Sequence, residues 1–251
     1  MNLTGNTVLI TGGTSGIGRG LAEALHRSGN TVVIAGRRRA ALDAVTAANP
    51  GMAAVELDLT DPAAIKATAR AVLADHPDLN VLINNAGIML PDDAAGPLDE
   101  DVLLGHVTTN LLGTIRTTSA FIDHLKKQPR ATIVYNTSTL AFTPLASFAS
   151  YSATKAALHS YALSQRFLLR DTSVSVQEIV PPWVATGLVG SPDDPRAMPL
   201  EAFLEQTLEA LGTDSEEVLV DEARIHRDNV GPREHAFVTE LNTRMAEALK
   251  D

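Results

Sequence analysis

Residues 7–18 read TVLITGGTSGIG, a β-branched run followed by a glycine-rich turn. The run TVLIT is typical of a buried strand, and the residues from Gly16 onward have the apolar spacing of a helix. Glycine permits a tight turn, lets an anion approach backbone N–H groups, and lets the helix pack close to the sheet. Because the anion would lie at the positive end of the helix, the stretch predicts a phosphate-binding βα unit. Glycine also occurs in ordinary tight turns, so the rest of the chain has to show whether this turn binds a phosphate.

Short β-branched runs continue to alternate with longer Ala-rich stretches along the chain. Strands separated by helices imply right-handed crossovers and a parallel sheet covered on both faces. The expected fold is therefore doubly wound α/β, with residues 1–251 forming a single domain. The expected strands are 7–11, 31–35, 53–58, 81–84, 132–136 and 174–180, and the expected helices are 16–28, 38–47, 62–75, 99–127 and 151–170.

The pattern changes after Pro181. The stretch 181–199 contains five prolines, which excludes a regular element, whereas 199–212 and 214–228 return to a helical period. No stretch has the composition of a domain linker. Residues 187–230 are therefore expected to form an excursion from the same domain, acting as a mobile lid over the substrate site.

Composition limits the classes of function. The 45% hydrophobic and 4% aromatic content predicts a core of Ala, Val, Leu and Ile, as in parallel sheets. A formal net charge of -10 disfavours binding to nucleic acid or anionic membranes. The chain has no cysteine, and its seven histidines have no metal-ligand spacing. His106 and His159 are interpreted as ordinary surface or packed residues. Without a leader or an apolar run of roughly 20 residues, we expect a cytoplasmic protein that needs no metal.

A second stretch, YSATK at residues 151–155, places Tyr151 and Lys155 four positions apart. On a helix these side chains share a face, although such pairs also arise by chance. An ammonium roughly 4 Å from a phenol stabilises the phenolate by about 4 kcal/mol at an effective dielectric constant of about 20. Because one pKa unit corresponds to about 1.4 kcal/mol, Lys155 is expected to lower the pKa of Tyr151 toward neutrality.

The spacing TGxxxGIG at residues 11–18, taken with later motifs, resembles the short-chain dehydrogenase/reductase family. The resemblance covers roughly residues 5–186 and implies a Rossmann-type fold that binds a nicotinamide cofactor. Ser138 and Tyr151 lie thirteen positions apart, as expected in this family. The matching motifs are Asn84-Asn85-Ala86-Gly87 for NNAG, Asn110 for the mid-helix asparagine, Ser138 for the catalytic serine, and Tyr151 with Lys155 for YxxxK.

The resemblance also implies roles for these residues. Tyr151 would exchange a proton with the substrate, and Ser138 would donate a hydrogen bond to the substrate oxygen. Lys155 would lower the pKa of Tyr151 and hold the nicotinamide ribose. Asn110 would hold a water that links Lys155 to solvent, since a buried amide needs a partner. The expected cofactor-binding residues are Gly12, Thr14, Ser15, Gly16, Ile17, Gly18, Arg37, Arg38, Asp58, Leu59, Asn85, Ala86, Gly87, Tyr151, Lys155, Pro181, Val184 and Thr186.

The residues after the second strand favour NADP(H). NAD enzymes of this fold place a carboxylate there, which binds the ribose hydroxyls and repels a 2′-phosphate. Here Gly36 is followed by three arginines, so Arg37 can bind the phosphate bidentately and Arg38 can add a cation. The same arginines would otherwise simply begin an exposed helix, and Ser15 stands where many NADP-preferring relatives carry a basic residue. Asp58 is expected at the adenine edge.

Two features depart from the family's usual pattern. Pro182 follows Pro181 where the family has glycine, so the strand must end there and Val184 and Thr186 are expected to meet the cofactor. The C-terminal segment lacks the family's glycine-ending tail strand. It is similar instead to a branch that includes an oxidoreductase encoded with teichoic-acid D-alanylation genes. Because the tail strand usually takes part in tetramer contacts, the expected homo-oligomer is left as a dimer or a tetramer.

The sequence therefore predicts an NADP(H)-dependent oxidoreductase that transfers a hydride between nicotinamide and a hydrophobic, uncharged carbonyl or alcohol substrate. One alternative is a non-catalytic nucleotide sensor, against which the intact Ser138, Tyr151 and Lys155 count. Another is an epimerase or dehydratase, which usually needs more than the 65 residues that follow Thr186. The expected pocket walls are Ile88, Met89, Leu90, Leu140, Phe142, Phe148, Trp183, Leu188 and Met198.

Overall fold

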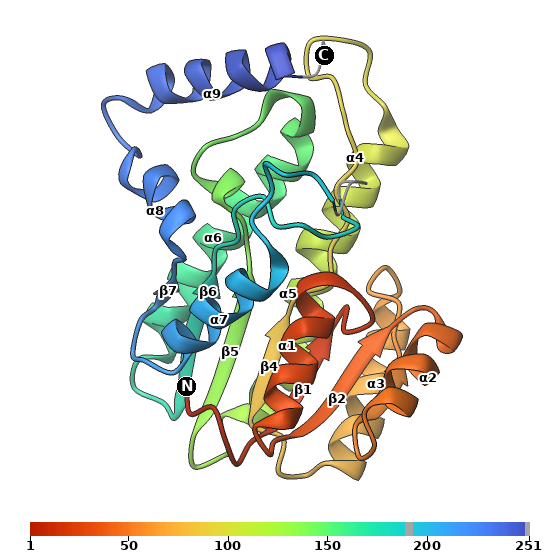
Figure 1. Cartoon of the computed structure of the whole chain (residues 1–251). Coiled ribbons are helices and arrows are strands. Elements are labelled where there is room, and N and C mark those ends of the chain that lie inside the picture. Colours follow the sequence, from red (N-terminus) through yellow and green to blue (C-terminus); the bar gives the residue numbers. More distant parts are fainter. Residues whose placement is uncertain (189–192, 249–251) are drawn as a thin grey trace.

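The computed structural model describes residues 1–188 and 193–248. Within these residues, seven parallel strands form one sheet in the order β3-β2-β1-β4-β5-β6-β7 (Figure 1). The strand order reverses beside β1, which pairs with β2 on one side and β4 on the other. This is the doubly wound topology predicted from the sequence. The strands are β1 (Thr7–Thr11), β2 (Thr31–Gly36), β3 (Ala53–Glu56), β4 (Val81–Asn84), β5 (Ala131–Asn136), β6 (Val174–Ile179) and β7 (Glu217–Val218).

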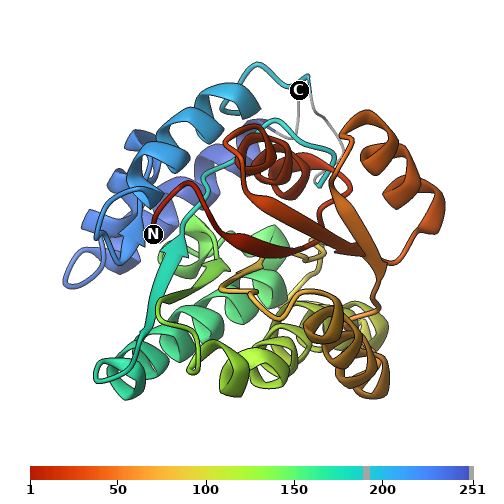
Figure 2. The same cartoon turned by 90° about the horizontal axis from the view of Figure 1, so that it is seen from below.

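Helices cover both faces of the sheet (Figure 2). The two faces have separate hydrophobic cores, one around Ile10 and Phe203 and the other around Phe121 and Tyr135. The start expected for a helix at residue 62 is confirmed, because the carboxylate of the preceding Asp61 accepts hydrogen bonds from the first turn of that helix. On one face lie α1 (Gly16–Arg27), α2 (Arg39–Ala48) and α7 (Leu200–Leu211), and on the other lie α3 (Pro62–Asp75), α5 (Thr114–Leu125) and α6 (Ala149–Leu169).

The stretch 99–127 is not the single α-helix that the sequence predicts. It consists of α4 (Glu100–His106), a π-helix (Val107–Gly113) and α5. The apolar period of a sequence does not distinguish a π-helical turn from an α-helical one, and such turns are frequent at functional sites.

The segment 214–228 also differs from its predicted helical structure. Glu217 and Val218 form β7 by pairing with Glu178 and Ile179 of β6, so a short seventh strand stands where the sequence predicts none. Two residues are too few to produce a strand period. The chain then forms α8 (Asp221–Asp228) and α9 (Glu234–Ala248), which runs across the top in Figure 1.

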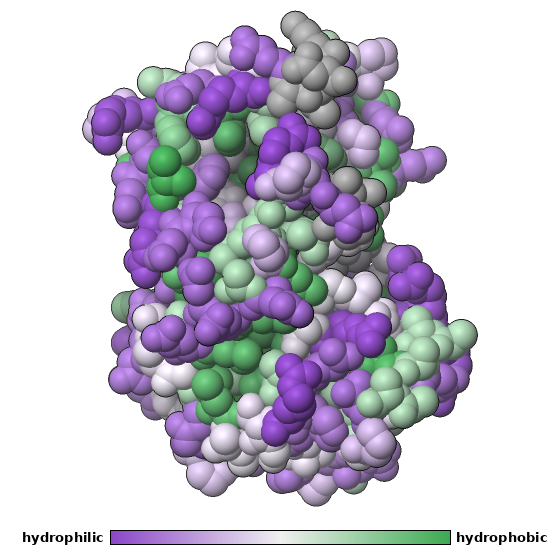
Figure 3. All heavy atoms as spheres, viewed as in Figure 1, coloured by the Kyte–Doolittle hydropathy of each residue, from purple (hydrophilic) through white to green (hydrophobic). Residues whose placement is uncertain are grey.

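The expected lid, 187–230, is partly a core element. Helix α7 packs beside α1 and buries Phe203 and Leu211 completely. Hydrophobic residues are also visible on the face of the molecule that carries α1 and α7 (Figure 3). Residues 189–192 of the expected lid lie outside the described residues. None of the helices described is long and apolar enough to cross a membrane.

Candidate active site

The glycine-rich turn brings β1, α1 and the end of β4 into close contact. Gly12 has a φ of +70°, which favours glycine. A Cβ atom on Gly18 would lie 2.2 Å from Asn85 Nδ2 and 2.4 Å from the Gly12 carbonyl oxygen. Only glycine therefore lets α1 begin this close to the strand ends. Ser15 makes no capping hydrogen bond, which leaves the first-turn amides of α1 able to bind an anion.

Asn85 joins the carboxyl ends of three neighbouring strands. Its amide nitrogen donates to the carbonyl oxygens of Thr11 (3.0 Å) and Gly12 (3.3 Å), and its amide oxygen accepts from Asn136 Nδ2 (2.8 Å). The Thr11 hydroxyl accepts from the backbone N–H groups of Asn85 and Ala86. Thr11 and Asn136 are not among the residues predicted from the sequence. Their position, at or directly after strand ends on one edge of a parallel sheet, is the signal that could have identified them.

Tyr151 and Lys155 lie on the first turns of α6 and are both buried, at 5% and 4% exposure. The Lys155 ammonium donates to the Asn136 carbonyl oxygen at 2.7 Å and lies 5.5 Å from the centre of the Tyr151 ring. Ser138 follows β5 and is also buried, and its hydroxyl oxygen accepts from the Leu140 N–H at 3.1 Å. The structure thus brings the predicted serine, tyrosine and lysine to the same end of the sheet.

Asn110 lies in the π-helix and holds the backbone of the segment after β4. Its amide oxygen accepts from the Ile88 N–H, and its amide nitrogen donates to the Ile88 carbonyl oxygen, both at 2.9 Å. A Cβ atom on Gly87 would lie 3.3 Å from Asn110 Oδ1 and 3.8 Å from Lys155 Nζ. Gly87 therefore lies close to both side chains, so the asparagine belongs to the same cluster as the lysine.

The expected effect of Lys155 on Tyr151 is corrected by the structure. Burial raises the pKa of Tyr151 to about 12, and the neighbouring Ser138 hydroxyl only partly opposes this rise. Burial also lowers the pKa of Lys155 to about 8, against an opposing effect of the Glu178 carboxylate. Removing both groups from water disfavours their charged forms, and the spacing of the two residues in the sequence does not reveal this cost.

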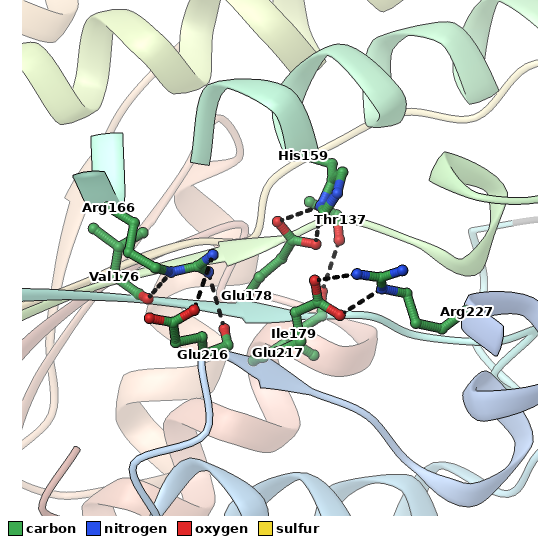
Figure 4. A network of polar contacts seen from close by, with 9 residues as sticks. All are labelled: Thr137, His159, Arg166, Val176, Glu178, Ile179, Glu216, Glu217 and Arg227. Carbon is green, nitrogen blue, oxygen red and sulfur yellow. Dashed lines mark hydrogen bonds and ion pairs between the residues drawn. The ribbon is translucent and has the colours of Figure 1, made fainter. Parts of the chain in front are cut away.

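A polar network lies on the β6 side of this cluster (Figure 4). The fully buried Glu178 carboxylate accepts a hydrogen bond from His159 Nδ1, which lies 2.8 and 3.1 Å from its two oxygens. His159 is one turn after Lys155 on α6. Next to this pair, Arg227 of α8 binds Glu217 of β7 through two hydrogen bonds of 2.7 and 3.1 Å. The network connects the helix that carries Lys155 with the C-terminal elements.

The predicted contacts for the adenosine end lie after β2 and β3. Arg37 and Arg38 are exposed. Asp58 follows β3 and is already hydrogen-bonded by Thr60, whose backbone N–H and hydroxyl both donate to Asp58 Oδ1. The Thr60 amide lowers the pKa of Asp58 most, and the Arg37 guanidinium adds to this effect. The arginine and the carboxylate thus lie close enough to act on each other across neighbouring strand ends.

The remaining predicted cofactor contacts lie in the turn itself or on the segments that follow β3 and β6. A Cβ atom on Gly16, which has a φ of +51°, would lie 3.3 Å from Thr186, so the segment after β6 reaches the start of α1. The Pro181 carbonyl oxygen accepts from Thr139 N–H at 2.9 Å, and Val184 forms a bridge with Met198. Leu59 is buried, Ile17 packs against the core, and Thr14 lies beside Gly36.

Two expected pocket walls are core residues. Phe142 and Met198 are buried in the core cluster, and the Phe142 ring contacts the His159 ring at a centroid distance of 4.7 Å.

Across residues 1–188 and 193–248, the acidic and histidine side chains form no group of three able to hold a metal ion.

The strand order, the glycine-rich turn and the serine, tyrosine and lysine at one sheet edge define an oxidoreductase of Rossmann-type fold. A family model for short chain dehydrogenase matches residues 6–196. The chain therefore belongs to the short-chain dehydrogenase/reductase family, as predicted from its motifs.

Within this family the chain is similar to one particular branch. It is 38% identical to the uncharacterized oxidoreductase DltE of Bacillus subtilis strain 168 over 249 residues, which are 97% of this chain and 99% of that protein. This confirms the predicted branch.

Solved structures give a consistent comparison. A short chain dehydrogenase from Burkholderia cenocepacia in complex with NADP has a TM-score of 0.85 and 27% identity, with 96% of this chain and 99% of that one covered. A short chain dehydrogenase/reductase from Burkholderia phymatum in complex with NAD has a TM-score of 0.81 and 22% identity, with 91% and 95% covered, and shows the fold alone.

Proposed function

We propose that this protein is an NADP(H)-dependent reductase of carbonyl compounds that can also run the reverse reaction. The observation that carries the proposal is the convergence of Tyr151, Lys155 and Ser138 beside Gly87, with a fully buried ammonium that donates to a strand-end carbonyl group. Burying an ammonium is costly, and within residues 1–188 and 193–248 Lys155 forms no ion pair, so its position is better explained by chemistry than by stability.

In this proposal the bound nicotinamide supplies or accepts the hydride, and the chain supplies the proton and the binding groups. The Tyr151 phenol donates its proton to the carbonyl oxygen, the Ser138 hydroxyl donates a hydrogen bond to the same oxygen, and Lys155 stabilises the phenolate that remains. Asn110 fixes the Ile88 backbone beside Lys155, where it can hold a water that returns the proton.

The residues around the glycine-rich turn fit a dinucleotide. The close approach of Gly12, Gly18 and Asn85 leaves no room for a side chain, and the free first turn of α1 suits a pyrophosphate. Arg37 is exposed at the end of β2 and is proposed to bind the 2′-phosphate, with Arg38 beside it. The NADP complex of the Burkholderia cenocepacia relative is compatible with this preference.

The substrate is proposed to be hydrophobic and uncharged, because residues of the segment after Gly87 and around Trp183 are mostly apolar. The test is a screen of ketones and aldehydes for NADPH oxidation, with Tyr151→Phe as the control variant. We expect the variant to keep its cofactor affinity and to lose 100-fold or more in turnover, roughly the effect of removing a positioned proton donor. A variant that keeps about half of the wild-type rate would contradict the proposal.

We also propose that the chain forms one domain and assembles as a homo-oligomer, either a dimer or a tetramer. Leu163, Phe167 and Leu168 are 46%, 65% and 73% exposed on the outer side of α6, and such an apolar surface suits a second copy. A lid role is proposed only for the described residues between Thr186 and α7, since α7 belongs to the core. Light scattering of wild type and Phe167→Glu tests the assembly, and amide exchange with and without NADPH tests the lid.

A further inference from the structure

His106, the last residue of α4, is a fully buried histidine that the proposed chemistry does not use. Its Nε2 accepts a hydrogen bond from the Leu90 N–H at 2.9 Å, and its Nδ1 lies 2.7 Å from the Ser150 hydroxyl. A backbone N–H can only donate, so Nε2 carries no proton. The neutral ring therefore has its proton on Nδ1 and donates it to Ser150.

His106 and Asn110 together hold one stretch of backbone. They are four positions apart, and they bind alternate residues of the segment 88–92: Asn110 binds both backbone groups of Ile88, and His106 binds the N–H of Leu90. This arrangement resembles the pairing of a strand, with two side chains in place of a neighbouring backbone. The two side chains, from α4 and the π-helix that follows it, thus fix the path of the segment that directly follows Gly87, beside Lys155.

The far end of the segment is attached to the start of α6. Asp92 Oδ2 accepts from the Ser150 N–H at 2.8 Å, and the Asp92 N–H donates to the Ser147 carbonyl oxygen at 3.1 Å. Burial would raise the pKa of Asp92, but the hydrogen bonds from Ser150 and from the Ala149 amide lower it, so the carboxylate stays charged. Ser150 precedes Tyr151, whose ring meets the His106 ring edge-on at 6.1 Å. One cluster therefore joins the segment, the helix α4 and the residue next to the proposed proton donor.

We propose that neutral His106 is a positioning residue that holds the segment 88–92 against Tyr151 and so determines how tightly the carbonyl substrate binds. This inference rests on the proposed function. A proton on Nε2 would remove the acceptor for the Leu90 N–H, so protonation of His106 releases the middle of the segment while Asn110 still holds Ile88.

Burial of the ring and one neighbouring carboxylate, Asp92, decide the pH at which this release occurs. Among the described residues, Asp92 from the segment and Tyr151 from α6 are the titratable groups that face the ring. Burial lowers the pKa of His106, and the Asp92 carboxylate opposes this effect without cancelling it. The segment is therefore held at neutral pH and released as the pH falls below the ordinary range of histidine.

The kinetic test compares His106→Gln and His106→Phe with wild type, using the best carbonyl compound found in the NADPH screen. Glutamine retains an acceptor oxygen near the position of Nε2 but does not titrate, whereas phenylalanine retains the ring and has no acceptor. We expect the Phe variant to raise KM by about 3- to 10-fold at pH 7.5, the loss of roughly one hydrogen bond, with the NADPH Kd unchanged. We expect the wild-type KM to rise as the pH falls toward 5.5. We expect the Gln variant to keep KM within about threefold and not to show this rise. His235→Gln, at an exposed position on α9, is the control.

Amide exchange of the peptide containing Leu90 provides a readout independent of activity. At a fixed pH of 7.5, the Phe variant should exchange there faster than wild type and the Gln variant should not. If wild type reduces no carbonyl compound, the proposed function fails, and this exchange result still decides whether His106 holds the segment. Equal exchange in wild type and His106→Phe would overturn the inference. A Phe variant with the wild-type KM and pH profile would also overturn it.

Discussion

Replacing Lys155 with methionine is expected to inactivate the enzyme and to stabilise its fold. Burial lowers the pKa of Lys155 from 10.5 to about 8, and at about 1.4 kcal/mol per pKa unit the charged form costs the folded state about 3 kcal/mol. Methionine removes this cost but leaves the Asn136 carbonyl oxygen without its 2.7 Å donor, which offsets about 1 kcal/mol. The free energy of unfolding should therefore rise by about 2 kcal/mol at pH 7, or roughly 4–8 °C in Tm for a chain of this size.

The dependence of this gain on pH has a definite sign. Below pH 8 the lysine is charged in the folded and the unfolded chain, so the full cost of burial is present in wild type. Between pH 8 and 10.5 the unfolded chain binds more protons than the folded one, so wild-type stability rises with pH and the advantage of the variant disappears. Thermal unfolding of both proteins at pH 7, 8.5 and 10.5 measures this change. Lys66→Met, on the exposed side of α3, is the control. A variant less stable than wild type at pH 7, or an advantage independent of pH, would refute the reasoning.

Three further substitutions test the remaining parts of the site. Arg37→Ala should weaken NADPH binding by about 10- to 100-fold and leave NADH binding unchanged, and equal losses for both cofactors would contradict the 2′-phosphate role. Gly18→Ala places a Cβ atom 2.2 Å from Asn85 Nδ2 and should lower the free energy of unfolding by about 1–3 kcal/mol. An unchanged Tm would show that the turn shifts to accept the added methyl group. Glu178→Gln removes the carboxylate that favours charged Lys155, so the alkaline limb of the pH profile of kcat/KM for reduction should move to lower pH. An unmoved limb would mean that Glu178 serves only to hold His159.

The parts predictable from the sequence are those with local signals. The glycine-rich turn and the alternation of strands and helices predict the doubly wound sheet, because each strand and each helix carries its own period. The YxxxK spacing likewise predicts that Tyr151 and Lys155 share a helix face, as they do. The period does not predict β7, since two residues paired at a sheet edge carry no alternation. It also does not predict the π-helix around Asn110, whose geometry depends on contacts with the segment after β4.

The contacts that the sequence does not predict are long-range and involve polar residues. Asn136 contacts Asn85 only because β4 and β5 pair in one particular register. His106 belongs to the site because its partners Leu90 and Ser150, 16 and 44 positions away, converge on it. Interpreting His106 as an ordinary packed histidine is correct for its burial and omits its partners. In a sequence, a helical histidine with such partners cannot be distinguished from one without them.

The burial of Tyr151 and Lys155 bears on the direction of the proposed reaction. With a pKa of about 12, the Tyr151 phenol keeps its proton at neutral pH, and carbonyl reduction begins with a phenol that can donate. Alcohol oxidation begins instead with the phenolate, the form that burial disfavours. Lys155, with a pKa of about 8, is charged at pH 7 and lies 5.5 Å from the ring centre, so it stabilises the phenolate that reduction leaves. At neutral pH, the protonated Tyr151 phenol and the charged Lys155 ammonium are therefore the forms from which carbonyl reduction starts.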